Sequence, residues 1–246
     1  MRVARVAAPI MALVSGVAGL GFAAAQTVTA PRELEPSIGL TPQEPARQAE
    51  PAKTMTAVSS GPPRVDEAWA AVNAAKAGIP LPAMRAYANA QLNGPTGCRV
   101  GWPTLAGIGW VESQHGTLNG RSLGDDGRSS TPILGPALDG EPYAAIAATP
   151  ETTVWHGDLD WDHAVGPMQF IPSTWSRWGQ DGDGDGITDP NDIDDAAAAA
   201  VAYLCADGHD LTSGAGWADA IFGYNHDEAY VASVHAAASE YAARTS

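Results

Sequence analysis

The chain has 246 residues and a formal net charge of −15, with 13 Lys and Arg residues against 28 Asp and Glu residues. Such an acidic chain lacks the basic surface that binding to nucleic acid or to anionic lipid requires, so we expect neither partner. With 181 residues left from position 66 onward, the chain is long enough for one sizeable core and short for two domains.

Residues 1–25 have the order of a secretory signal peptide. Arg2 and Arg5 precede an apolar run, and small residues precede position 26, where we expect cleavage. The alternative is an uncleaved anchor helix, because the run from Val6 to Phe22 is just long enough to cross a bilayer. We therefore expect a secreted, periplasmic or cell-wall location, with or without an N-terminal anchor.

Residues 26–65 have the composition of a disordered linker. They hold seven of the 19 prolines and no aromatic residue. Such a segment cannot bury enough apolar surface to offset the entropy of ordering the chain. We expect a flexible tether that ends where a folded domain begins, at residue 66.

From residue 66 onward the patterns are mainly helical. Residues 117–165 are rich in Gly, Asp, Ser and Thr and predict a long loop region with at most a short hairpin. No alternation of strands with helices is present, so a single, mainly α domain with long loops and little β-structure is expected. The expected helices span residues 66–77, 81–92, 102–115, 172–178, 194–206, 217–222 and 227–244.

The two cysteines are Cys98 and Cys205. In an oxidising compartment such a pair, without Cys-x-x-Cys spacing, most simply forms one disulfide. Two free buried thiols are the alternative, and either reading is structural.

Glu112 is the informative acid of the sequence. In the segment WPTLAGIGWVESQHG, the spacing of four and seven residues puts Glu112 on one helical face with Ile108 and Leu105. An acid in an apolar stripe has its pKa raised by burial, as a general acid near neutral pH requires. The alternative is a Glu near a helix end that reaches solvent.

Three separated segments carry a family resemblance: ESQHG at 112–116, AVGPMQFIPSTW at 164–175 and GYN at 223–225. In this order they resemble the lytic transglycosylases of bacterial cell walls, most closely the membrane-bound lytic transglycosylase B type. The resemblance covers roughly residues 80–243. It implies a lysozyme-like fold of the goose-type lysozyme and SLT kind.

The resemblance also implies roles for individual residues. Glu112 matches the family's single catalytic acid, and Tyr224 the tyrosine whose hydroxyl orients that carboxyl group. Pro167 and Gly223 depart from the family's pattern. The positions that match substrate-contacting residues are Ser113, Met168, Gln169, Tyr224 and Asn225.

The implied reaction needs only one carboxyl group. The acid protonates the oxygen between N-acetylmuramic acid and N-acetylglucosamine, and the carboxylate then takes the proton of the muramoyl C6 hydroxyl. That hydroxyl closes onto C1 and gives a 1,6-anhydro end. An intramolecular hydroxyl has a very high effective concentration, so a second acid is unnecessary. The implied partner is the peptidoglycan strand, bound by a monomer that could also join cell-wall enzyme complexes.

Two other functions stay open. A hydrolytic muramidase needs a second acid, and the loop region offers Asp125, Asp126, Asp158, Asp160 and Asp162. A non-catalytic cell-wall-binding protein is the second alternative.

The stretch DGDGDGITDPND at 181–192 resembles an EF-hand loop. Acids alternate, Gly186 stands at the sixth place, and oxygen ligands of this kind favour Ca²⁺. We expect a structural calcium ion and no organic cofactor, because the glycine-rich runs lack a phosphate-loop pattern. The expected ligands are Asp181, Asp183, Asp185, the backbone oxygen of Ile187, Asp189 and Asp192.

Overall fold

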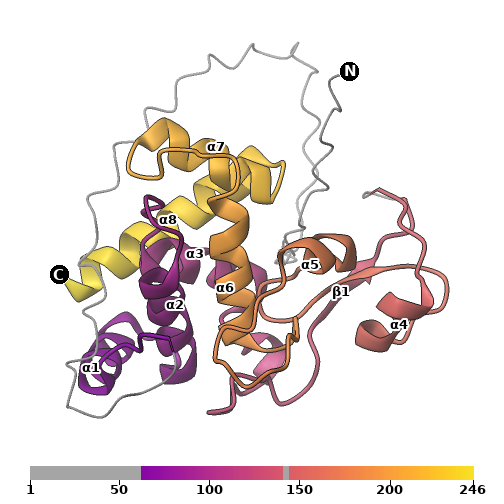
Figure 1. Ribbon diagram of the computed structural model, residues 1–246, viewed down its shortest axis with the longest axis horizontal. Helices are drawn as coiled ribbons and strands as arrows, with labels where there is room; N and C mark the ends of the chain where they lie inside the picture. The colour runs from indigo at the N-terminus through magenta and orange to yellow at the C-terminus, as the bar shows by residue number, and fades with distance from the viewer. Residues whose placement is uncertain (1–61, 141–143) are drawn as a thin grey trace, which may run out of the picture.

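A computed structural model describes residues 62–140 and 144–246 of the chain. Within these ranges the protein has eight α-helices and one small antiparallel sheet of two strands, β1 and β2 (Figure 1). The expected mainly helical single domain is confirmed. The elements are α1 (Glu67–Ala77), α2 (Leu81–Asn93), α3 (Trp102–Ser113), β1 (Leu134–Ala137), α4 (Pro150–His156), β2 (His163–Val165), α5 (Pro172–Trp178), α6 (Ile193–Leu204), α7 (Gly214–Tyr224) and α8 (Glu228–Thr245).

Helix α3 is the central element. It packs along α8 and also contacts α2 and α6, and all of its residues except Trp110 and Val111 are buried. A Cβ atom at Gly107 would lie 2.8 Å from the backbone oxygen of Val234, and one at Gly109 would lie 2.0 Å from the hydroxyl of Tyr87. The two glycines therefore let α8 and α2 approach α3 closely, and burial extends around α3 rather than along one stripe.

Several helix ends follow from local capping. The side chain of Asp66 accepts from the amide of Trp69 at 2.9 Å, and Gly78 ends α1 with a φ of 74°. Helix α3 ends at Ser113, two residues earlier than expected, because Gln114 and His115 take left-handed φ angles of 52° and 60°.

Helices α4 and α7 also differ from the expectation. Helix α4 lies in the region that we expected to be loop, and it begins at a capping box formed by Thr149 and Thr152. Helix α7 begins at Gly214, three residues before the expected start, with the Ser213 hydroxyl accepting from the amide of Gly216 at 3.0 Å.

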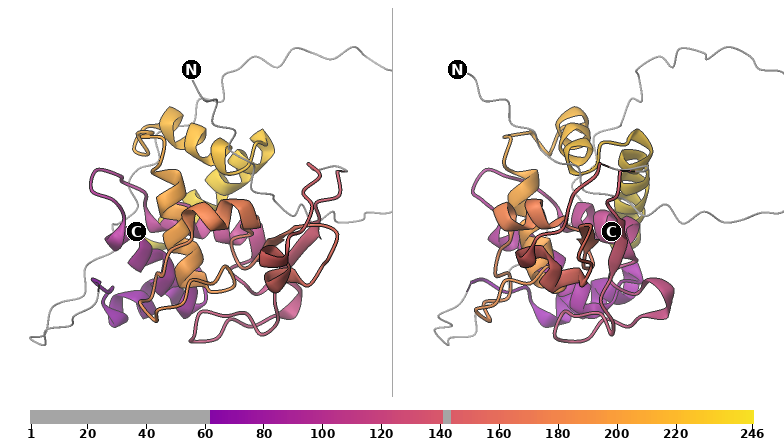
Figure 2. Two further views of the ribbon diagram at one scale, coloured as in Figure 1. Left: turned by 45° about the vertical axis from the view of Figure 1, so that its right-hand side comes forward. Right: turned by 90° about the vertical axis from the view of Figure 1, so that its right-hand side faces the viewer.

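The segment from β1 to β2 forms a small lobe beside the helices. It carries the antiparallel strand pair together with α4, and because this helix lies in the connection between the strands, the pair is not the short hairpin that we expected. Figures 1 and 2 show this lobe on the opposite side of the molecule from α1. Gln169, which follows β2, faces β1, because a Cβ atom at Gly135 would lie 2.9 Å from its Oε1.

The disulfide between Cys98 and Cys205 is confirmed and joins the loop before α3 to the end of α6. It closes a separation of 107 residues. In the chain-entropy model a loop of this length stabilises the fold by about 4 to 5 kcal/mol.

The packed part of the chain starts slightly before residue 66. Val65 is 3% exposed, and its amide donates to Oδ1 of Asn89 on α2 at 2.8 Å. The expected signal peptide at 1–25 and most of the expected linker lie outside the described residues. Among the described helices, none is long and apolar enough to cross a membrane.

Candidate active site

Glu112 lies in the last turn of α3 and has no exposed surface. Its Oε1 accepts a hydrogen bond of 2.7 Å from the hydroxyl of Tyr230. Its Oε2 is buried without a hydrogen-bond partner among the described residues. Burial raises the pKa of Glu112 well above its usual range, and the hydrogen bond from Tyr230 opposes this effect. Burial therefore favours the protonated form of this carboxyl group.

Two tyrosines lie beside this carboxyl group. The rings of Tyr224 and Tyr230 stack with an interplanar angle of 5° and a centroid distance of 6.4 Å. The hydroxyl of Tyr224 donates to the backbone oxygen of Met168 at 3.0 Å. The tyrosine that touches the carboxyl group is thus Tyr230 on α8, and Tyr224, expected in that role, instead holds the segment that carries Met168.

That segment is a tight turn between β2 and α5. The amide of Val165 donates to the backbone oxygen of Phe170 at 2.9 Å, and the reverse bond is 3.0 Å. Gln169 has a φ of 50°, and its Nε2 donates to the backbone oxygen of Gly166 at 2.9 Å. Its Oε1 is a second buried acceptor without a partner among the described residues. Strained backbone of this kind at a non-glycine residue is typical of functional sites.

Ser113 fastens the turn to the end of α3. Its hydroxyl donates to the backbone oxygen of Pro167 at 2.5 Å and accepts from the amide of Gly116 at 2.7 Å. Contacts therefore connect Ser113, Met168 and Tyr224 into one buried cluster around Glu112. Asn225 follows α7 and is 9% exposed, and no side-chain hydrogen bond joins it to this cluster within the described ranges.

His115 lies behind the cluster. Its Nδ1 is 3.0 Å from the hydroxyl of Tyr87 and its Nε2 is 2.8 Å from that of Tyr241. Burial lowers the pKa of His115 to about 3, so the ring is neutral. It ties the strained end of α3 to α2 and α8.

The five candidate second acids are engaged elsewhere or exposed. Asp162 accepts from Thr152 at 2.6 Å and lies 3.2 Å from Nε2 of His156. Asp158 pairs with His163, whose hydrogen bond is the main cause that lowers the Asp158 pKa to about 2. Asp125, Asp126 and Asp160 are exposed. Burial and the hydrogen bond from Tyr230 cause the shift in the pKa of Glu112, and no second carboxylate contributes to it.

The acidic loop gathers a different set of carboxylates from the one expected. Oxygen atoms of Asp181, Asp183 and Asp195 lie within 4.8 Å of one another and could bind an ion. Asp195 is in the first turn of α6, beyond the 12 positions of an EF-hand pattern, so the motif did not indicate it.

The remaining expected ligands have other contacts. Asp185 accepts from the amide of Ile187 at 2.7 Å, and Asp189 forms an ion pair with Arg128. Asp192 caps α6 by accepting from the amide of Asp194 at 2.9 Å. Asp185, Asp189 and Asp192 lie outside the cluster of Asp181, Asp183 and Asp195, and their role as ligands stays a prediction.

The carboxyl groups of Asp194 and Asp195, at the start of α6, have raised pKa values. Burial is the largest cause, and repulsion from neighbouring acids is a smaller one. Burial raises the pKa of Asp195 to about 6, and the charges of Asp192 and Asp183 add to this effect. The pKa of Asp194 rises to about 7, again mainly through burial. Carboxylates crowded in this way disfavour one another's charged forms.

Residues 155–221 match a family model, whose description is Transglycosylase SLT domain. The match includes the turn with Met168 and Gln169, the acidic loop and α6, and it leaves out Glu112, Tyr224 and Tyr230. Comparison with curated proteins gave no match, and comparison with solved structures gave none either. The chain thus contains, beside a buried glutamic acid whose pKa is raised, a 155–221 segment that is similar to the transglycosylase SLT domain.

Proposed function

We propose that the protein is a lytic transglycosylase of the membrane-bound lytic transglycosylase B type. It cleaves the β-1,4 bond between N-acetylmuramic acid and N-acetylglucosamine in peptidoglycan and leaves 1,6-anhydromuramic ends. The observation that carries the proposal is Glu112, an acid with no exposed surface beside a segment similar to the transglycosylase SLT domain.

In the proposed mechanism the two oxygens of Glu112 differ. Tyr230 donates to Oε1, so the carboxylic proton resides on Oε2, which has no partner among the described residues. Oε2 protonates the bridging oxygen and then accepts the proton of the muramoyl C6 hydroxyl. Ser113, Met168, Gln169, Tyr224 and Asn225 are the proposed substrate-contacting residues.

The buried position of Glu112 sets a condition on binding. A strand reaches Oε2 only if the groups that cover the carboxyl group move aside.

Calcium is the proposed structural ion at Asp181, Asp183 and Asp195. All three supply carboxylate oxygens, which Ca²⁺ prefers. When bound, the ion would neutralise part of the charge of the loop that connects α5 to α6. The proposed location is outside the cytoplasm, in agreement with the disulfide.

Product analysis tests the proposal. Purified murein is digested with the wild-type protein and with Glu112→Gln, and the products are identified by mass spectrometry. Anhydromuramic ends that depend on Glu112 support the transglycosylase. Reducing muramic ends would instead establish a hydrolytic muramidase. Murein that stays intact would contradict both activities and favour the non-catalytic cell-wall-binding protein.

A further inference from the structure

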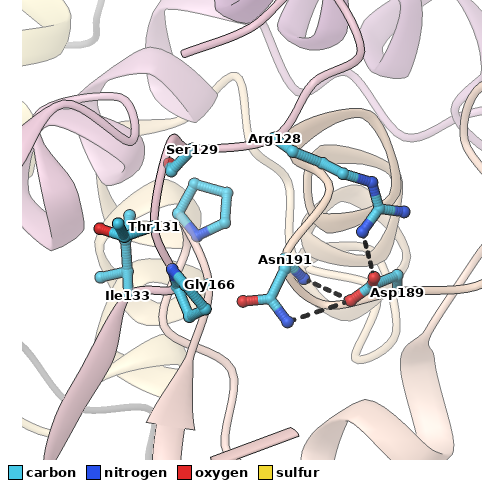
Figure 3. A pocket seen from close by; sticks show the side chains of 9 residues that line it. Arg128, Ser129, Thr131, Ile133, Gly166, Asp189 and Asn191 are labelled. Carbon is cyan, nitrogen blue, oxygen red and sulfur yellow. Dashed lines mark hydrogen bonds and ion pairs between the residues drawn. The ribbon is translucent and has the colours of Figure 1, made fainter. Parts of the chain in front are cut away.

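The two ends of the strand pair are held in different ways. At one end the amide of Gly166 donates to the backbone oxygen of Ile133 at 2.9 Å, beside a cavity of about 210 Å³ (Figure 3). At the other end the register shifts within β1, and Pro136 has no amide hydrogen to donate. A side chain bridges the strands there, because Nδ1 of His163 on β2 lies 2.7 Å from the backbone oxygen of Gly135 on β1.

Both ring nitrogens of His163 face acceptors. Nδ1 faces the Gly135 oxygen, and Nε2 lies 3.1 Å from Oδ2 of Asp158 in the loop that follows α4. The hydrogen bond from His163 is the main cause that lowers the pKa of Asp158 to about 2, so this carboxylate is ionised and can only accept. A neutral imidazole donates from one nitrogen, whereas the protonated ring donates from both. Only the protonated ring of His163 therefore makes both bonds.

The neighbouring histidine is arranged for the neutral form. Nδ1 of His156 accepts from the amide of Asp158 at 3.1 Å, so this nitrogen carries no proton. Nε2 of His156 lies 3.2 Å from Oδ1 of Asp162 and donates to it. The ring centroids of His156 and His163 are 5.1 Å apart, so charges on both rings would repel each other. The pair is built to hold one positive charge, on His163.

The other ionisable groups near His163 lie on the elements that pack against β2, which are β1, α4 and α5. Strand β1 offers only backbone, since none of its four residues is ionisable. Besides His156, α4 carries Glu151, and the loop after it carries Asp160, and both of these acids are exposed. Arg177 of α5 lies over the indole ring of the next residue, 4.9 Å from its centroid. In the described ranges, the ion pair of His163 is with Asp158.

We propose that His163 is a pH-sensitive clasp of the lobe. With both nitrogens protonated, the ring joins β1 to the loop that follows α4. When the ring loses one proton, either the Gly135 oxygen or the Asp158 carboxylate loses its donor, and this end of the strand pair loosens. Histidine ordinarily changes its charge between about pH 5 and 8. Because both acceptors favour the charged ring, the clasp holds at acidic pH and is lost as the pH rises.

Hydrogen exchange of backbone amides in the full chain measures the clasp. The reporters are the amides of Leu138 and Asp162, which donate across the lobe to the backbone oxygens of Asp162 and Ile146, each at 2.9 Å. Their protection factors, corrected for the intrinsic exchange rate, are followed by NMR from about pH 5 to 8. In the wild type they should fall about tenfold over this range, the effect of one lost hydrogen bond, while amides of α2 keep their protection.

Two variants separate the clasp from other titrations. His163→Gln removes the titrating ring and should abolish the fall. In Asp158→Asn the amide oxygen can still accept from the amides of Asp160 and Trp161, as Oδ1 does in the wild type, which turns the nitrogen toward Nε2 of His163. A donor at this place favours the neutral ring, so the fall should be absent here too. His226→Gln, which removes an exposed histidine between α7 and α8, is the matched control and should keep the fall.

The protonation state of the ring gives a second measurement that needs no variant. The ¹⁵N signals of the His163 ring in the wild type should show protons on both nitrogens at the acidic end of the range. A neutral ring there would overturn the proposal. Protection that does not change with pH in the wild type, a fall that persists in His163→Gln, or its loss in His226→Gln would overturn it as well. Because cleavage is not measured, the clasp stands or falls separately from the transglycosylase proposal.

Discussion

Tyr230 donates a 2.7 Å hydrogen bond to Oε1 of Glu112, a residue 118 positions earlier in the chain. The contact joins α8 to the end of α3, the two helices that pack along each other through the centre of the protein. It gives the carboxyl group a fixed orientation and makes its two oxygens inequivalent. The same bond lowers the pKa of Glu112 against the stronger effect of burial.

Tyr230→Phe removes this bond without changing the ring. We expect kcat/KM for murein cleavage to fall about 10- to 100-fold, because the acid loses its fixed orientation. The bond lowers the pKa of Glu112, so its loss raises that pKa and moves the alkaline limb of the pH profile to higher pH. Tyr203→Phe is the control, since its hydroxyl donates to the backbone oxygen of Gly223 at 2.6 Å. An unshifted alkaline limb in Tyr230→Phe would refute the orienting role.

Glu112→Gln separates catalysis from stability. Loss of the general acid should lower the rate by at least about 10²- to 10⁴-fold. The pKa of Glu112 is higher in the folded protein than in the unfolded chain, so the folded wild type binds more protons between the two values. Its stability is therefore lost as the pH rises through the folded pKa. Glutamine carries no such dependence.

Thermal unfolding of both proteins across the pH range measures this difference. The Tm of Glu112→Gln relative to wild type should increase from acidic to alkaline pH. A difference that is constant with pH would mean that folding does not raise the pKa of Glu112.

Calcium removal tests the acidic loop. Chelation should lower the Tm, because an ion at 100 times its Kd stabilises the fold by about 2.7 kcal/mol. For a domain of this size that is a shift of roughly 5 to 10 °C. Asp195→Asn should abolish the calcium-dependent shift, whereas Asp185→Asn should keep it, because Asp185 lies outside the carboxylate cluster. If Asp185→Asn abolished the shift and Asp195→Asn kept it, the ion would instead be bound by the ligands of an EF-hand loop.

The features that could be predicted from the sequence have local causes. Helix α1 was predicted with Asp66 as its first residue, whereas Asp66 caps it, and the predicted end before Gly78 depends on groups a few residues away. Pairing of the two cysteines followed from their number. The burial of Glu112 was also predicted, although α3 is covered almost all round rather than along one stripe.

The features that were missed depend on contacts between distant segments. Tyr230 reaches Glu112 only because α8 packs along α3, and no spacing in the sequence encodes that approach. Asp195 joins the acidic cluster because α6 begins there, outside the motif. The early start of α7 was missed because glycines are poor helix formers, and Gly216 is required where a Cβ atom would lie 2.5 Å from the Asp210 backbone oxygen.

Two glycine substitutions in helices should have opposite effects on stability. Gly109→Ala puts a methyl group 2.0 Å from the hydroxyl of Tyr87. Tyr87 has to shift and lose its 3.0 Å contact with His115, which we expect to destabilise the fold by about 1 to 3 kcal/mol. Gly223→Ala in α7 meets no atom within 4 Å and should stabilise the helix by about 0.5 to 1 kcal/mol. Urea denaturation measures both changes, and equal stabilities of the two variants would contradict the close approach of α2 to α3.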